Sequence, residues 1–205
     1  MTAAEKLQVV VVGGGLVGLS FANLLAASWP ERAAGIVVID QVPPPPVTDK
    51  VGVRVSALSP GSARILRDCG VWQSLPAERC GDYRRMVVWR NGGPRGPDSI
   101  SFDAADQGLA ALGHIVENDL VCRLLWERAA AAGVGLVTGA RPMEMTHEGG
   151  QVSLRLDDGS RVGARLVVGA DGPSSWVRDA AGLARQAWSY AQQGVVTHVQ
   201  PERPH

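Results

Sequence analysis

The sequence has few cysteines and no excess of charge of either sign. Its 205 residues include three cysteines, without Cys-x-x-Cys spacing, which argues against a disulfide framework or a zinc site and favours reduced thiols. The four histidines show no metal-ligand spacing either, so no metal site is predicted. Lysine plus arginine equals aspartate plus glutamate, with 20 of each, and these totals indicate no basic face for nucleic acid.

Long apolar runs are also missing. No stretch approaches the roughly 20 apolar residues of a membrane span. The N-terminus lacks a signal-peptide pattern, because glycines interrupt the apolar run that starts at Val9. We therefore expect a cytoplasmic protein, with peripheral attachment to the inner membrane left open. The chain is long enough for one domain and part of a second, and it can bury a real core.

The stretch from Val9 to Leu19 carries the strongest signal. Four consecutive valines indicate a buried parallel strand, and the apolar residues after Gly18 continue as a helix. In the intervening G-x-G-x-x-G, Gly13 permits a tight turn, Gly15 lets a pyrophosphate approach the backbone, and Gly18 lets helix and strand pack closely. The helix N-terminus adds N–H groups and a positive dipole. Glycine spacing is weak evidence in a chain with 25 glycines, but strand, loop and helix follow in the required order.

A second apolar segment, residues 36–39, is predicted to form the neighbouring strand and ends at Asp40. A carboxylate at this position accepts hydrogen bonds from both hydroxyls of an adenosine ribose and repels a 2′-phosphate. The alternative is that Asp40 only ends the strand before the next loop. With the glycine loop in place, the pattern predicts FAD or NAD at this site rather than NADP.

The remaining segments alternate between helical and strand patterns. The proline run 43–46 predicts a stiff connection after the second strand. A helix is expected from Ser59 to Cys69, ended by Gly70, and a second helix, 119–132, is expected to be capped by Asn118. Strands are predicted at 84–90, 99–102, 134–138, 143–147, 151–155, 164–168 and 194–199, with 84–90 and 99–102 assigned to an antiparallel layer.

Residues 166–178 form another strand-to-loop-to-helix pattern, and Asp171 lies where that strand ends. Open α/β sheets bind ligands at the carboxyl ends of their strands, although an ordinary Asp-Gly turn would give the same dipeptide.

The D-G-x-x-S-x-x-R pattern of residues 171–178 resembles the second motif of the flavin-dependent aromatic hydroxylases, which have the fold of p-hydroxybenzoate hydroxylase. Residues 54–59 resemble the R-x-x-A-L-S segment of the ubiquinone-biosynthesis hydroxylases, 112–118 their L-G-x-I-V-E-N, and 190–193 their Y-x-Q. The resemblance is specific because these motifs occur together and in order.

The resemblance implies a role for each matching residue. The ADP part of an FAD site would be formed by Gly13, Gly15, Gly18 and Asp40. Arg54 matches the arginine near the flavin, and a guanidinium suits a bidentate phosphate contact; otherwise it is a solvated strand residue. Arg123 matches a helix residue that faces the ribityl chain; otherwise it belongs to the helix surface. Asp171 matches an aspartate that serves the flavin, with a role toward the nicotinamide nucleotide left open. No catalytic residue is assigned.

The resemblance also implies an α/β fold, namely a Rossmann-like FAD-binding domain of the p-hydroxybenzoate hydroxylase (GR2) type with part of an antiparallel β-sheet substrate domain. Residues 1–80 and 116–183 would form the FAD-binding domain. Residues 81–115 and 184–205 would belong to the substrate domain, the latter as a truncated segment.

The function implied is that of an FAD-dependent monooxygenase that uses NAD(P)H and O₂ to hydroxylate a prenylated phenol or quinol in ubiquinone biosynthesis. The cofactor would carry the chemistry, while the protein positions the substrate and excludes water. Another FAD oxidoreductase on this fold, such as a prenyl reductase, is an alternative. A non-catalytic flavin-binding fragment is the other, because members of the family are considerably longer and their third motif, a G-D segment followed by a proline, is expected beyond His205. Peripheral membrane or biosynthetic-complex association, the ring position and the oligomeric state stay open.

Overall fold

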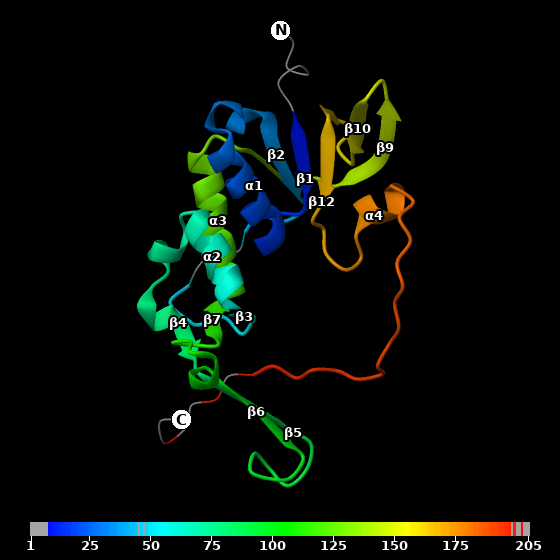
Figure 1. Ribbon diagram of the computed structural model, residues 1–205. Helices are drawn as coiled ribbons and strands as arrows, with labels where there is room; N and C mark the ends of the chain where they lie inside the picture. Colours follow the sequence, from blue (N-terminus) through cyan, green and yellow to red (C-terminus); the bar gives the residue numbers. More distant parts are fainter. Residues whose placement is uncertain (1–7, 45, 47, 198, 200–201, 203–205) are drawn as a thin grey trace.

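The computed structural model describes residues 8–44, 46, 48–197, 199 and 202, and its centre is a four-stranded parallel sheet (Figure 1). The strand order is β12-β1-β2-β8, with β1 at Val9–Val12, β2 at Ile36–Asp40, β8 at Gly135–Thr138 and β12 at Leu166–Gly169. All four valines of β1 are buried, because this strand lies inside the sheet and both of its faces are covered. The parallel order brings the carboxyl ends of β1, β2 and β12 to one edge, where such sheets bind ligands.

Two helices that pack against each other, α1 (Leu16–Ser28) and α3 (Asn118–Ala131), cover one face of the sheet. Their interface contains a buried amide. The Asn23 side-chain nitrogen donates to the Leu19 carbonyl at 2.8 Å within α1 and to the Leu125 carbonyl at 2.9 Å in α3. Because a buried amide without partners would be costly, these two bonds fix α1 against α3.

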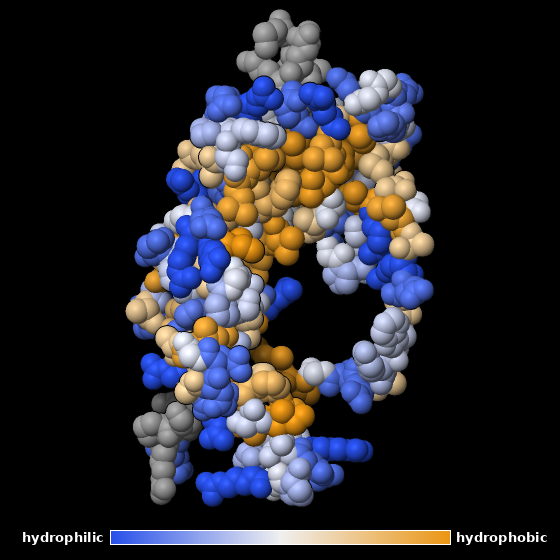
Figure 2. Space-filling model, viewed as in Figure 1, coloured by the Kyte–Doolittle hydropathy of each residue, from blue (hydrophilic) through white to orange (hydrophobic). Residues whose placement is uncertain are grey.

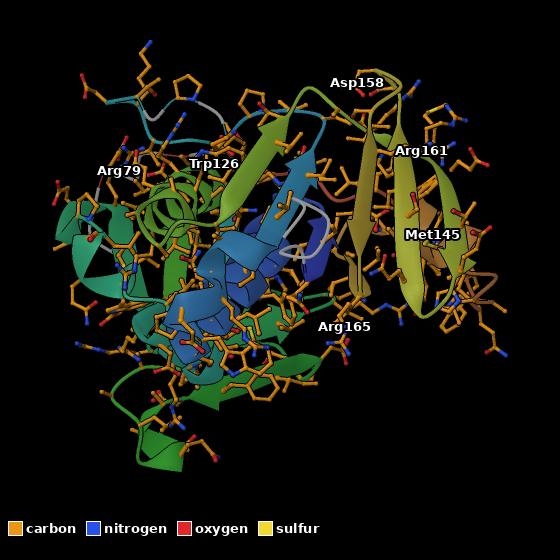
Figure 3. The ribbon with its side chains drawn as sticks, turned by 90° about the horizontal axis from the view of Figure 1, so that it is seen from above. Arg79, Trp126, Met145, Asp158, Arg161 and Arg165 are labelled. Atoms are coloured by element: carbon orange, nitrogen blue, oxygen red, sulfur yellow. The ribbon has the colours of Figure 1, made fainter. Side chains whose placement is uncertain are left out.

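The opposite face of the sheet carries an antiparallel meander. Its strands pair in the order β11-β10-β9, and the short helix α4 lies beside it (Figure 1). The view from above places the main sheet between α3, the side of Trp126, and the meander, the side of Met145 (Figure 3). A second core cluster fills this interface with Val10, Val12, Ile39, Leu154 and Leu156, among others. The bounds are β9 Pro142–Glu148, β10 Gln151–Leu156, β11 Arg161–Ala164 and α4 Trp176–Ala180.

The remaining strands form two smaller antiparallel units below α2 and α3 in Figure 1. One is a three-stranded sheet of order β3-β7-β4, and the other is the ribbon β5-β6. The bounds are α2 Pro60–Asp68, β3 Val55–Leu58, β4 Cys80–Tyr83, β5 Arg85–Trp89, β6 Ser99–Asp103 and β7 Gly113–Glu117. Short 3₁₀ turns lie at Pro30–Gly35, Trp72–Ser74, Ala77–Arg79 and Ala105–Gln107.

Apolar side chains gather on the face of the molecule shown in Figure 2. On α1, Val17 is 74% exposed and Phe21 is 36% exposed, so this helix is apolar on its outer side as well as its inner side. Among the described residues, no helix has the length and apolar character needed to cross a membrane.

Several predicted elements are confirmed. The α2 helix begins after Ser59, whose hydroxyl accepts a hydrogen bond from the Ser62 N–H at 3.2 Å, and it ends before Gly70, which has a φ of +75°. The ribbon β5-β6 pairs antiparallel as expected. The hairpin β9-β10 also pairs antiparallel, and its turn contains Gly149 and Gly150, both with positive φ.

Three local predictions were wrong. Asn118 does not cap α3 but is its first residue, with Glu117 at the N-cap position; the Asn118 side-chain oxygen instead accepts from the Ser56 hydroxyl at 2.6 Å. The strand 164–168 is divided between β11 and β12, because the chain turns at Arg165 and its N–H bonds to the Gln8 carbonyl at 3.2 Å. The described residues of the predicted strand 194–199, namely 194–197 and 199, form no strand.

Candidate functional site

The loop between β1 and α1 is built from glycines that have different steric roles. Gly13 has a φ of +110°, and a Cβ there would overlap the Ala170 carbonyl in the loop after β12. A Cβ on Gly18 would overlap the Gly13 carbonyl oxygen. These two glycines therefore permit the turn and the close packing of loop, helix and strand that the sequence predicts.

Gly15 differs from both. A Cβ built on this residue meets no heavy atom within 4 Å, so packing within the described part of the chain does not require a glycine here. It is the N-cap residue of α1, and no side chain caps that helix N-terminus. The first turn of α1 contains no acidic residue either. The space beside Gly15 is thus open to an anionic group next to a helix N-terminus, which favours anions.

Asp40 is held against the same loop at the end of β2. Its Oδ2 accepts a hydrogen bond from the Gly14 N–H at 2.5 Å, and its Oδ1 accepts from the Val42 N–H at 2.9 Å. A carboxylate oxygen has a second lone pair, so both oxygens retain acceptor capacity for a ligand hydroxyl. The backbone therefore orients the carboxylate without exhausting it.

A cavity of about 420 Å³ lies at this edge of the sheet, within the size range of small-molecule sites. Its lining includes the glycine loop and Asp40, an apolar wall of Ala140 and Pro142, and residues 170–172. A neighbouring cavity of about 310 Å³ shares Pro142 with it and is also lined by Trp176.

Asp171 lines both cavities, but its carboxylate is already engaged by the start of α4. Its Oδ1 accepts from the Ser175 hydroxyl at 2.5 Å, and its Oδ2 accepts from the N–H groups of Trp176 at 2.6 Å and Val177 at 3.1 Å. Asp171 therefore organises the turn that enters α4. Its role toward the flavin stays a prediction.

The two predicted arginines lie outside the residues that line the cavity. Arg123, half-buried on α3, donates from Nη2 to the Pro44 carbonyl at 2.7 Å and so fastens the loop after β2. Arg54 is exposed directly before β3. Burial and Asp119 raise the pKa of the Cys122 thiol to about 11, while the charge of Arg54 lowers this pKa and that of Asp40 raises it.

The structure brings Gly13, Gly15, Asp40 and Asp171 together around the cavity, with Gly18 packed beneath the loop. The apolar wall formed by Ala140 and Pro142 was not predicted, because no motif marks residues that contribute only backbone and small side chains. Among the described residues, no group of His, Cys, Asp and Glu is arranged to hold a metal ion.

Comparison with known sequences settles the family. The profile of the FAD-binding domain family matches residues 6–204. This chain belongs to that family. The open space at Gly15, the oriented Asp40 carboxylate and the cavity beside them fit the ADP part of FAD. The geometry of the site therefore agrees with the family match.

The relatives are the proteins that the motifs indicated. The chain is 35% identical over 201 residues to 3-demethoxyubiquinol 3-hydroxylase of Escherichia coli, covering 97% of this chain and 49% of the relative. It is 33% identical to the mitochondrial ubiquinone biosynthesis monooxygenase COQ6 of Homo sapiens, covering 92% of this chain and 42% of the relative. The chain thus spans about half the length of the curated relatives it matches, and the predicted resemblance is confirmed.

Solved structures agree on the fold. The ternary complex of aklavinone-11 hydroxylase with FAD and aklavinone matches with a TM-score of 0.62 and 28% identity, over 89% of this chain and 36% of that one. PqsL, a probable FAD-dependent monooxygenase from Pseudomonas aeruginosa, matches with a TM-score of 0.67 and 22% identity, over 90% of this chain and 48% of that one. The predicted α/β fold of the p-hydroxybenzoate hydroxylase type is confirmed.

Proposed function

We propose that this chain is the FAD-binding part of a monooxygenase that hydroxylates a prenylated phenol or quinol in ubiquinone biosynthesis, with NAD(P)H as reductant and O₂ as oxidant. The family match and the names of the relatives support this reading. The observation that carries it is the pairing of an open Gly15 with an oriented Asp40 in one cavity. A closed loop or an inward-facing side chain at residue 15 would have argued against any dinucleotide.

Different residues of the cavity would bind the pyrophosphate, the ribose and the adenine of the ADP moiety. Gly15 and the N-terminus of α1 would receive the pyrophosphate, since both the space and the helix dipole suit an anion there. The Asp40 carboxylate would accept from the ribose hydroxyls. The apolar wall of Ala140 and Pro142 suits the face of an adenine ring. Bound flavin would supply the oxygen-transfer chemistry, which no side chain offers.

The three remaining site residues take their proposed roles from the family resemblance. Arg54 would place a positive charge near the flavin, and its exposure leaves the guanidinium accessible. Arg123 would serve the ribityl chain indirectly, since its bond to Pro44 fixes the loop that follows Asp40. Asp171 would contribute from the turn before α4, where it lines the cavity. We also propose the division into FAD-binding and substrate segments. An association with a membrane or a biosynthetic complex is likewise a proposal.

A titration separates this function from its alternatives. The chain is titrated with FAD and with NAD, followed by flavin fluorescence and by calorimetry respectively, and Asp40→Ala serves as the site control. We expect FAD to bind and the variant to bind it more weakly. Oxygen uptake and product formation are then measured together with NAD(P)H and a prenylated phenol. Bound FAD with oxygen uptake and no product is expected if this chain supplies only the FAD-binding part, whereas hydroxylated product would show that the chain is catalytic by itself. A chain that binds no FAD would contradict the proposal.

A further inference from the structure

A buried ion pair outside the cofactor cavity joins two segments that are far apart in the sequence. The Glu117 side chain is 4% exposed, and its carboxylate meets the guanidinium of Arg79 in a forked arrangement. Nε donates to Oε1 and Nη2 donates to Oε2, both at 2.6 Å. The Gly52 N–H donates to the same Oε2, also at 2.6 Å. A buried carboxylate is tolerated when it is paired and hydrogen-bonded in this way.

The guanidinium also donates hydrogen bonds to the backbone that leads to Gly52. Arg79 donates from Nη1 to the Thr48 carbonyl at 2.9 Å and from Nη2 to the Lys50 carbonyl at 3.4 Å. The ion pair is therefore bonded to residues 48, 50 and 52 of one loop. A lysine would keep the charge of Arg79 but not this planar set of donors. Arg79 lies at the edge of the molecule in Figure 3, on the α3 side of the sheet.

The same loop ends at Arg54, which Glu117 and its neighbour hold from the other side. Glu117 pairs through its backbone with Val55 where β7 meets β3, and the Asn118 N–H donates to the Arg54 carbonyl at 3.0 Å. Arg54 thus lies between Gly52, which the Glu117 side chain holds, and Val55, which the Glu117 backbone holds. Its own side chain is exposed.

We propose that Arg79 and Glu117 are positioning residues, which fix the loop 48–54 so that the Arg54 guanidinium is presented to the flavin. The inference rests on the proposed function, because the presented group acts only when FAD is bound. Arg79, Glu117 and Arg54 all lie outside the residues that line the cofactor cavity. The family resemblance places Arg54 near the flavin, so the effect of Arg79 and Glu117 on FAD would pass through Arg54.

The first test needs no cofactor. Amide hydrogen exchange is compared between the parent chain, Arg79→Lys and Glu117→Gln. Loss of charge-assisted bonds to the loop should speed exchange at Gly52 roughly tenfold or more. Exchange in β1 and β2 should not change. Arg155→Lys is the matched control, because its ion pair with Glu144, at 2.8 Å, joins two partly exposed side chains on neighbouring strands of the meander. Unchanged exchange at Gly52, or equal acceleration throughout the chain, would show that the Arg79–Glu117 pair does not clamp the loop 48–54, and would overturn the proposal.

The second test asks whether the clamp acts through Arg54. FAD dissociation constants are measured for the parent, Arg79→Lys, Arg54→Ala and the double variant. We expect each single variant to weaken FAD binding and the double variant to bind no more weakly than Arg54→Ala, since coupled residues are not additive. Additive losses would overturn the positioning role. If the parent binds no FAD, the proposed function fails, and the exchange experiment still decides whether the clamp exists.

Discussion

The steric difference among the loop glycines gives the sharpest prediction, because it separates cofactor binding from folding. Gly15→Ala places a methyl group in space that no described heavy atom occupies within 4 Å. The backbone accepts it, since Gly15 has φ −83° and ψ −173°, a conformation open to any residue. Gly18→Ala places the same methyl group against the Gly13 carbonyl. The two changes are chemically identical and lie three residues apart, at the N-cap of α1 and in its first turn.

The expected magnitudes have opposite signs in the absence of FAD. Gly→Ala at a compatible backbone position stabilises a protein by about 0.4–1 kcal/mol through the unfolded state, so Gly15→Ala should be neutral or slightly stabilising. Overpacking costs roughly 1–3 kcal/mol or more, and Gly18→Ala should fall in this range. With FAD present, the methyl group of Gly15→Ala occupies the approach of the pyrophosphate. A loss of only about 1.4 kcal/mol there is a tenfold weaker Kd, which we take as the minimum effect.

Urea unfolding without cofactor and FAD titration of the folded chain measure the two quantities separately. Gly163→Ala is the matched control, because its Cβ also meets nothing within 4 Å and it lies in β11, away from the cavity. The reasoning is refuted if Gly15→Ala destabilises the chain without FAD as much as Gly18→Ala does. An unchanged FAD dissociation constant in Gly15→Ala would refute it equally.

Three further predictions follow from the contacts. Asp171→Ala should lower the free energy of unfolding by about 1 kcal/mol without FAD, because α4 loses an N-terminal acceptor; an unchanged melting temperature would return Asp171 to a purely cofactor-related role. Asp40→Ala should weaken FAD binding more than Asp40→Asn does, since the amide oxygen retains one acceptor for the loop, and equal losses would count against this. Burial raises the pKa of both Cys69 and Cys122 from 9.0 to about 11, so their stabilising contribution is complete below pH 9.0 and is lost as the pH rises toward 11; urea unfolding across this window should show a decline that shrinks when both are replaced by alanine.

The parts of the fold that the sequence predicts are those set by local chemistry. The valines of β1 signal a strand buried on both faces, and the strand is fully buried. Ser59, Pro60 and Gly70 mark the ends of α2 through backbone preferences that operate over a few residues. Such signals survive folding because tertiary contacts do not oppose them.

The failed predictions concern positions where distant contacts decide. Asn118 has the side chain of a helix cap, but the Ser56 hydroxyl from β3 engages it, and α3 begins one residue earlier than the cap would allow. The described residues among 194–199 form no strand despite their apolar content, because apolar content alone does not specify a neighbouring strand for the backbone hydrogen bonds. The turn at Arg165 depends on its bond to Gln8, 157 residues away in sequence (165 minus 8).

The candidate site shows the same division. The glycines of the G-x-G-x-x-G spacing and Asp40 could be predicted as candidate site residues from the sequence, because each belongs to a recurring pattern for binding a dinucleotide at the end of a strand. The Arg79–Glu117 pair could not be predicted from the sequence, since its members come from a 3₁₀ turn and from the end of β7 and meet only in the folded chain. Asp171 was assigned to the cofactor, whereas its carboxylate also caps α4, a double use that its motif does not reveal.

The central claim is that this chain holds FAD through the glycine loop and Asp40, and cofactor selectivity tests it most directly. The purified chain is equilibrated with equal concentrations of FAD and NAD, separated from free ligand, and analysed by its absorption spectrum and by the nucleotides released on denaturation. We expect a flavin spectrum from the parent, a much weaker one from Gly15→Ala, and a flavin signal from Gly163→Ala equal to that of the parent. Stoichiometric NAD with no flavin in the parent would contradict it.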